Sequence, residues 1–196
     1  MSTSVNRLDR RAVVSRLLAD RGEAIVVTGL GSPTYDVAAC GDHDRNVYLW
    51  GAMGGCAVMA LGIALARPDT PVIAVTGDGE MLMGVGSFAT IAMQAPKNLT
   101  VVVLDNGLYG ETGGQASHSV VADLAAIAGA SGIADTRAID DMEAVSGLAL
   151  RATSVGNGPC VAVVKIDQAE RERVLPTRDG HAIRARVRQS LGLSID

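Results

Sequence analysis

Two apolar runs, each ending at a short polar turn, constrain the fold of this chain more than any other feature. The runs cover residues 71–75 and 99–104, and the turns after them carry Asp78 and Asn106. Apolar runs that stop at small polar residues are typical of buried strands. The segment between them, residues 81–94, is long enough for a helix. This order predicts a right-handed parallel unit, with Asp78 and Asn106 side by side at one sheet edge.

These two oxygen-bearing side chains predict a metal site. Neighbouring strands lie about 4.8 Å apart, and Mg²⁺ binds oxygen ligands at about 2.1 Å. One ion can therefore contact the Asp78 carboxylate and the Asn106 amide oxygen together. A backbone carbonyl just past Asn106, a water molecule and two phosphate oxygens would complete an octahedron. The turn therefore indicates a cradle for magnesium and a diphosphate.

The glycines around Asp78 favour the same interpretation. Gly77 and Gly79 permit positive φ and a close backbone approach. A helix that opens after Gly79 offers free N–H groups to a phosphate. Gly-Asp-Gly on its own favours an ordinary tight turn, which also uses an Asp flanked by glycines. It is the combination with Asn106 that favours a binding site.

Together these motifs resemble the diphosphate-binding domain of thiamine diphosphate (ThDP) enzymes. Gly-Asp-Gly, a helix-length segment and Asn106 match that family's diphosphate motif. Residues 49–54, Leu-Trp-Gly-Ala-Met-Gly, resemble its segment that contacts the aminopyrimidine ring. Residues 105–115 resemble the β subunit of sulfopyruvate decarboxylase and the matching domain of phosphonopyruvate decarboxylase. The resemblance covers about residues 12–166 and implies ThDP and Mg²⁺ as cofactors.

The resemblance also assigns roles to individual residues. It implies that the Gly51 carbonyl accepts a hydrogen bond from the 4′-amino group, that the Met53 N–H donates to the ring, and that the Met53 side chain supports the bent cofactor. It implies Asp78, Asn106 and Leu108 as metal ligands, and Met53, Glu111 and His118 as catalytic candidates. The cofactor-binding residues that it implies are Gly31, Ser32, Gly51, Ala52, Met53, Gly77, Asp78, Gly79, Glu80, Asn106, Leu108, Tyr109 and Gly110.

Simpler interpretations of three of these residues stay open. Ser32 precedes Pro33 and is equally expected as the N-cap of a helix. Met53 at a helix start is more often a core residue. His118 is more often a solvated loop histidine. Glu80 departs from the Ser or Ala that many relatives carry there, and only its N–H needs to contact a phosphate.

The remaining pattern predicts a single domain over residues 1–196, with a core at 12–166 and a solvated helical tail at 168–196. Further strands are expected at 24–28, 46–49, 136–139 and 160–166, and further helices at 6–21, 54–66, 123–130 and 140–153, the last with Asp140 as N-cap. Alternation of strand and helix predicts a doubly wound, mostly parallel α/β sheet with helices on both faces. The resemblance implies that this sheet is the ThDP-binding fold of the diphosphate type.

Charge and cysteine content exclude several classes of protein. The net charge of −4 argues against a nucleic-acid partner. Cys40, Cys56 and Cys160 lack C-x-x-C spacing, which argues against zinc and iron–sulfur sites. Residues 1–11 lack an apolar signal core, and the apolar stretches are too short to cross a bilayer. We therefore expect a soluble, cytoplasmic protein without a membrane partner.

The resemblance implies the β subunit of a decarboxylase that acts on a short anionic 2-oxo acid such as sulfopyruvate or phosphonopyruvate. A family member also needs a pyrimidine-binding domain, for which 196 residues leave no room, so we expect a separately encoded α subunit and a hetero-oligomer. A carboligase, a 2-oxoacid oxidoreductase β subunit and a ThDP-binding module without turnover are the alternatives. The missing cysteine pattern counts against a cluster-bearing oxidoreductase.

Overall fold

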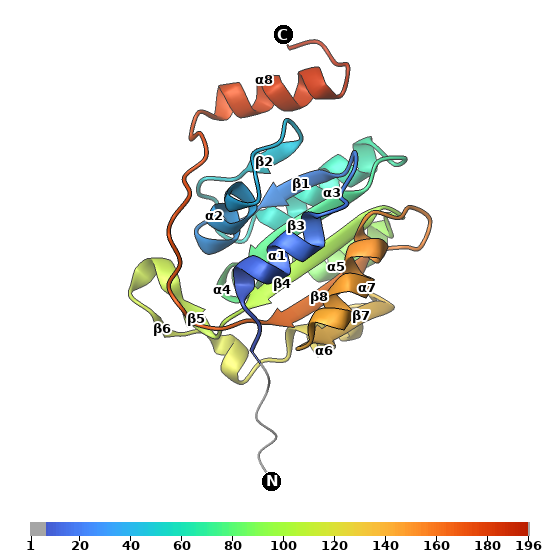
Figure 1. The fold of residues 1–196 in the computed structure, drawn as a ribbon. Helices are drawn as coiled ribbons and strands as arrows, with labels where there is room; N and C mark the ends of the chain where they lie inside the picture. The colour runs from blue at the N-terminus through green and yellow to red at the C-terminus, as the bar shows by residue number, and fades with distance from the viewer. Residues whose placement is uncertain (1–6, 196) are drawn as a thin grey trace.

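A parallel sheet of six strands forms the centre of the computed structural model, which describes residues 7–195 (Figure 1). The strand order is β2-β1-β3-β4-β8-β7, and every neighbouring pair is parallel. The predicted doubly wound, mostly parallel α/β fold is therefore confirmed. The strands are β1 (Ile25–Thr28), β2 (Asn46–Tyr48), β3 (Val72–Gly77), β4 (Leu99–Asp105), β7 (Asp135–Ile139) and β8 (Cys160–Lys165).

Helices cover both faces of this sheet. One face packs against α1 (Arg10–Leu18), α2 (Ser32–Ala39) and α7 (Met142–Ala152). The other packs against α3 (Cys56–Ala66), α4 (Asp78–Met83), α5 (Ser87–Gln94) and α6 (Leu124–Ala130). Strand side chains alternate between the faces, so Ile73 enters the first core and Ala74 the second. Burial on both faces explains why the strands appear in the sequence as continuous apolar runs.

The chain changes direction across the sheet between β1 and β3. From β1 it passes to β2 on one side, and it then returns to β3 on the other side of β1. In an open α/β sheet, such a reversal leaves a crevice at the carboxyl ends of the two strands, where ligands bind. A ligand-binding site is therefore expected at the carboxyl ends of β1, β3 and β4.

The crossover between β3 and β4 is two helices, whereas one helix over residues 81–94 was expected. The break falls at Gly84-Val85-Gly86, between α4 and α5. At this point the chain passes directly over Gly54, and a Cβ atom on Gly84 would lie 2.3 Å from the Gly54 carbonyl oxygen. The break thus lets the loop that contains Met53 lie against the end of α4.

The C-terminal segment docks on the sheet edge. Helix α8 (Gly180–Ser190) lies beside β2 (Figure 1). Ile183 is buried, and the Arg186 guanidinium donates to Asp42 Oδ2 at 2.6 Å and to the Asn46 carbonyl at 3.1 Å. The tail is therefore partly packed, not a wholly solvated helix, and its helix begins at Gly180, not near residue 168.

Other helix boundaries differ little from expectation. Helix α7 has Asp141 as its N-cap in place of Asp140. The first helix, expected over 6–21, is α1, and the expectations for residues 1–6 lie outside the described residues. Within residues 7–195, none of the helices combines the length and the apolar composition needed to cross a membrane.

Asn98 generates a prediction about stability. Its buried Nδ2 group donates to the carbonyls of Ala64 (3.2 Å), Arg67 (2.9 Å) and Thr70 (2.7 Å), which joins the end of α3 to the start of β4. Asn98→Ala removes these hydrogen bonds, including the donor to the carbonyl of the buried Ala64, so we expect a loss of about 1–3 kcal/mol in the free energy of unfolding. Urea denaturation measures it. The exposed Asn157→Ala control should change little, and an equal effect of both would contradict this role.

Candidate functional site

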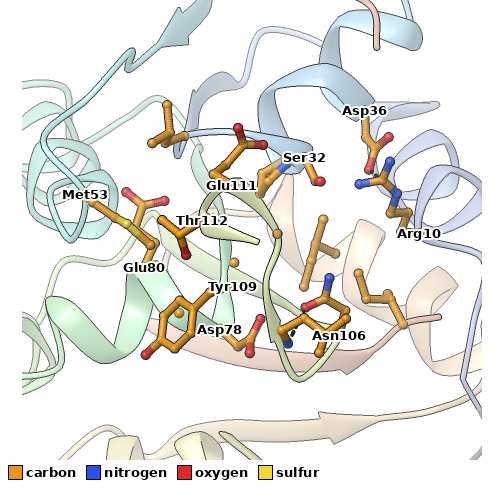
Figure 2. A pocket seen from close by; sticks show the side chains of 18 residues that line it. Arg10, Ser32, Asp36, Met53, Asp78, Glu80, Asn106, Tyr109, Glu111 and Thr112 are labelled. Atoms are coloured by element: carbon orange, nitrogen blue, oxygen red, sulfur yellow. Dashed lines mark hydrogen bonds and ion pairs between the residues drawn. The ribbon is translucent and has the colours of Figure 1, made fainter. Parts of the chain in front are cut away.

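A cavity of about 120 Å³ opens at the carboxyl ends of β1, β3 and β4. It lies where the strand order reverses, as expected for this class of sheet. Most of the residues predicted from the sequence line it: Ser32, Met53, Gly77, Asp78, Gly79, Glu80, Asn106, Leu108, Tyr109, Gly110 and Glu111. Segments from four separate loops therefore meet at one site (Figure 2).

Four predicted residues do not line the cavity. Gly31, with φ +79°, immediately precedes α2, and Gly51 (φ +113°) and Ala52 (φ +50°) shape the loop that leads to Met53. A positive φ is uncommon for a residue with a side chain such as Ala52 and marks a constrained loop. His118 lies outside the cavity, exposed, with its Nδ1 atom 3.0 Å from the Tyr109 hydroxyl. The structure thus places His118 outside the cavity, beside Tyr109, which does line it.

Asp78 is the buried carboxylate at the middle of the cavity. It is 2% exposed, and its Oδ2 atom accepts hydrogen bonds from the hydroxyls of Ser117 and Ser119, the latter at 3.0 Å. Among residues 7–195, side chains donate only to Oδ2 and leave Oδ1 free of such donors. Burial raises the pKa of Asp78, and the Ser117 hydrogen bond opposes that rise.

Behind Asp78 lies a charged network that the sequence did not reveal. The Ser119 hydroxyl also lies 2.7 Å from Asp105 Oδ1, and Lys165 pairs with Asp105 Oδ2. A hydroxyl has one proton, so Ser119 can donate to only one of the two carboxylates at a time. The sequence analysis predicted no role for Ser117 or Ser119. Within the Ser-His-Ser segment at 117–119, it considered only His118 as a site residue.

Asn106 ends β4 in a tight turn toward the cavity. Its Oδ1 atom accepts a hydrogen bond from the Leu108 N–H at 2.9 Å, and its backbone carbonyl accepts from Gln168 Nε2 at 2.9 Å. Asn106 and Leu108 both line the cavity together with Asp78. Carboxylate, amide and carbonyl oxygens form the hard donor set that Mg²⁺ takes when a phosphate supplies further oxygens. These residues therefore fit a magnesium ion bound with a phosphorylated ligand.

Gly77 and Gly79 lie in ordinary backbone conformations, and Gly79 is required because a neighbouring side chain packs where its Cβ atom would be. Gly77 has φ −95° and Gly79 lies within α4, so neither glycine adopts the positive φ that it permits. A Cβ atom on Gly79 would lie 2.4 Å from Tyr109 Cε1, because the tyrosine ring packs directly on this turn. The N-cap of α2 is Gly31, which offers no side-chain acceptor, and Ser32 is the first helical residue. The first N–H groups of α2 therefore stay free of a side-chain cap.

Glu80 has a structural role that its position in the motif did not indicate. Its side chain is 4% exposed, its Oε2 atom accepts a hydrogen bond from Thr76 at 2.8 Å, and a Cβ on Gly29 would lie 1.6 Å from that oxygen. Glu80 therefore fills the space beside the β1–α2 loop, at the Met53 end of the cavity (Figure 2). Burial raises the pKa of Glu80, and the Thr76 hydroxyl opposes the rise.

Glu111 lies at the mouth of the site. It belongs to a short 3-10 helix, η1 (Gly110–Thr112), inside the hairpin of β5 (Leu108–Tyr109) and β6 (Gln115–Ala116). Its side chain is exposed and folds over Gly31, where an added Cβ would lie 2.6 Å from Glu111 Oε1. This places a titratable carboxylate beside the β1–α2 loop and the cavity.

The family follows from this geometry and from comparison with known proteins. Residues 35–164 match the model of the thiamine pyrophosphate enzyme, C-terminal TPP binding domain. The chain belongs to this family of thiamine pyrophosphate enzymes. The resemblance inferred from Gly-Asp-Gly, Asn106 and residues 49–54 is confirmed.

Two named decarboxylases illustrate the similarity. A phosphonopyruvate decarboxylase of Streptomyces viridochromogenes is 37% identical over 94% of this chain and 47% of its own length. The sulfopyruvate decarboxylase subunit beta of Methanothermobacter thermautotrophicus is 33% identical over 81% of this chain and 82% of its own length. The chain thus spans about half of the former protein and most of the latter.

Solved structures agree on the fold. Benzoylformate decarboxylase from Polynucleobacter necessarius superposes with a TM-score of 0.70 over 84% of this chain and 34% of that one, at 21% identity. At this identity the likeness extends to the arrangement of strands and helices. It confirms the α/β fold independently of the sequence motifs.

Glu80 generates a prediction about pH. Because the folded-state pKa of Glu80 lies above the ordinary value of 4.5, the unfolded chain releases a proton that the folded protein retains, and stability falls as the pH rises from the ordinary value through the folded-state pKa. We expect Glu80→Gln to be more stable than the wild type near neutral pH and equal to it below the ordinary pKa. Urea denaturation at both pH values measures this.

A matched control for this experiment is Glu172→Gln, because Glu172 is exposed. This variant should differ little from the wild type at either pH. If Glu80→Gln destabilises the protein at neutral pH, the carboxylate of Glu80 is ionised and favourable in the fold, and this account of its burial is wrong.

Proposed function

We propose that this chain is the diphosphate-binding subunit of a ThDP- and Mg²⁺-dependent decarboxylase that acts on a short anionic 2-oxo acid. The observation that carries the proposal is a single cavity in which Asp78 and Asn106 lie in the middle and Met53 lies at one end. This arrangement suits a ligand with a diphosphate at one end and a ring at the other. The alignment with a named decarboxylase subunit over 82% of its length supports it.

In this proposal the chain's own residues bind and orient the cofactor. Asp78, Asn106 and the Leu108 carbonyl would hold the magnesium ion, and the N–H groups at the start of α2 would bind the phosphates. The loop of Gly51 and Ala52 would set the position of Met53, whose side chain would support the ring. Bound ThDP supplies an electron sink for the carbanion that forms when a 2-oxo acid loses CO₂. Glu111, an exposed carboxylate at the mouth, is the group that we propose for proton transfer.

The proposed substrate is sulfopyruvate, phosphonopyruvate or a close analogue. The named relatives act on these compounds, both of which carry a second anion beside the 2-oxo acid. Side chains for this anion must reach the Met53 end of the cavity, where this chain places the carboxylate of Glu80 (Figure 2). We therefore assign the cationic groups for the substrate to a partner subunit.

We further propose a hetero-oligomer with a separately encoded pyrimidine-binding α subunit. The phosphonopyruvate decarboxylase extends well beyond the part matched by this chain, whereas the relative named as a subunit beta is matched over most of its length. An apolar strip on α3, α4 and α5 supports a partner on this face. Its exposed side chains are Val58 (47% exposed), Met59 (39%), Met83 (62%) and Met93 (81%).

The proposed location is the cytoplasm, where thiols such as Cys40 stay reduced.

One alternative has its own support. The subunit beta of a 2-oxoacid:ferredoxin oxidoreductase from Saccharolobus solfataricus is 48% identical over 53% of this chain. Such an enzyme would pass electrons onward after the loss of CO₂. Within residues 7–195 no group of three or more His, Cys, Asp or Glu side chains could hold a metal ion, so a cluster would have to lie elsewhere. Reduction of an added electron acceptor would favour this alternative.

The proposal is tested by measuring CO₂ release from a panel of 2-oxo acids, with Mg²⁺ and ThDP, by the chain alone and by the chain assembled with a candidate α subunit. We expect turnover only in the complex. Robust turnover by the chain alone would contradict the need for a partner. A complex that binds ThDP and releases no CO₂ from any 2-oxo acid would contradict the decarboxylase.

Asp78 generates a prediction about the metal. Asp78→Ala removes the carboxylate ligand and its charge, so Mg²⁺-dependent ThDP binding should fall below detection in calorimetry, and Asn106→Ala should do the same. Ser117→Ala removes only a hydrogen bond that orients Asp78, and we expect a loss of about 10-fold in Mg²⁺ affinity. Circular dichroism should show all three variants folded. Wild-type affinity in either ligand variant would disprove the magnesium site.

A further inference from the structure

One cationic side chain lies at the end of the cavity opposite Met53. Arg10 is the first residue of α1, is 6% exposed, and lines the cavity together with Ser32 and Asn106. It reaches this place because Leu8 pairs with Ile166 just beyond β8, which starts α1 at the carboxyl edge of the sheet. Its guanidinium faces the cavity beside Ser32 (Figure 2).

Within the described chain, the Arg10 side chain has one distant ion-pair partner and no hydrogen bond. Its Nε atom lies 3.5 Å from Asp36 Oδ2 and has no hydrogen-bond partner. Asp36 is shared, because Arg11 donates to Asp36 Oδ1 through both Nε (3.2 Å) and Nη2 (3.1 Å). Two guanidinium groups therefore face one carboxylate, and the cluster carries a net positive charge.

A buried cation with unused donors indicates an anionic ligand. A guanidinium has five N–H donors, and buried charges are normally paired and hydrogen-bonded. Among the hydrogen bonds of residues 7–195, none involves the Arg10 side chain. Its planar fork matches two oxygens of a phosphate, which a lysine cannot do.

We propose that Arg10 binds the terminal phosphate of the cofactor. This inference rests on the proposed function, in which the ring lies at Met53 and the magnesium lies at Asp78 and Asn106. The diphosphate then extends away from Met53, and its last phosphate reaches the Arg10 end of the cavity. The second anion of the substrate belongs beside the ring, at the opposite end, and so lies away from Arg10.

The test compares two ligands that differ only in the terminal phosphate. Calorimetry on the chain assembled with a candidate α subunit, with Mg²⁺, gives the affinity for ThDP, and competition gives the affinity for thiamine monophosphate. We expect Arg10→Gln to weaken ThDP binding by about 10-fold to 100-fold, as for a lost hydrogen bond between charged groups, and to change monophosphate binding by about 2-fold or less. Arg10→Lys keeps the charge but loses the fork, so its loss should be smaller.

A matched control is Arg11→Gln. Arg11 contacts the same carboxylate of Asp36 and carries the same charge, but it does not line the cavity. We expect its affinity for ThDP to stay within about 2-fold of wild type. Thermal unfolding of the three variants without ligand separates folding defects from binding defects, and Arg10→Lys serves if Arg10→Gln does not fold.

The outcomes distinguish this inference from the proposed function. Failure of the wild-type complex to bind ThDP overturns the proposed function, and the ligand of Arg10 with it. Normal binding by the wild type and by Arg10→Gln overturns the role of Arg10 alone. Equal losses for ThDP and thiamine monophosphate, or equal losses in the Arg10 and Arg11 variants, would show a general effect of charge or stability and also overturn it.

Discussion

The parallel pairing of β3 with β4 is the constraint on which the rest of the site depends. Gly77 lies opposite Leu104 in this register, so the turns that carry Asp78 and Asn106 leave the sheet side by side. A shift of this register would separate the two side chains. The positions of these two turns constrain their surroundings. They affect the break between α4 and α5, the packing of Tyr109 on Gly79 and the placement of Met53.

Charge is distributed along the cavity in a way that suits a magnesium diphosphate. Asp78 is buried, and its charge is supported by hydroxyl donors, with the Asp105–Lys165 pair behind them. At one end lies the excess positive charge of the Arg10 and Arg11 cluster, and at the other lie Met53 and the buried Glu80. A metal ion in the middle and a phosphate at the cationic end would compensate the charges that the protein leaves unbalanced.

The sequence predicted the sheet, its parallel character and most of the cavity lining. These features depend on local pattern: apolar runs that end at Gly-Asp-Gly, and an Asn one helix length later. Where prediction was wrong, tertiary contacts decided. A Cβ at residue 84 would collide with the Gly54 carbonyl, which favours glycine and a broken helix at that point. At α7 the deciding contact is local: Asp141, not Asp140, is the N-cap, because its Oδ1 atom accepts a hydrogen bond from the Ala144 N–H at 2.7 Å.

By itself the sequence determined which turns carry the ligands and what chemistry their oxygens allow, because strand pattern and motif spacing are local properties. Only the tertiary structure decided which distant side chains surround those turns. Arg10 reaches the cavity because Leu8 pairs with Ile166, and Ser117 reaches Asp78 because the chain after β5 folds back over α4. Such contacts depend on the order of strands in the sheet and on helix packing, and no short stretch of sequence encodes either of these.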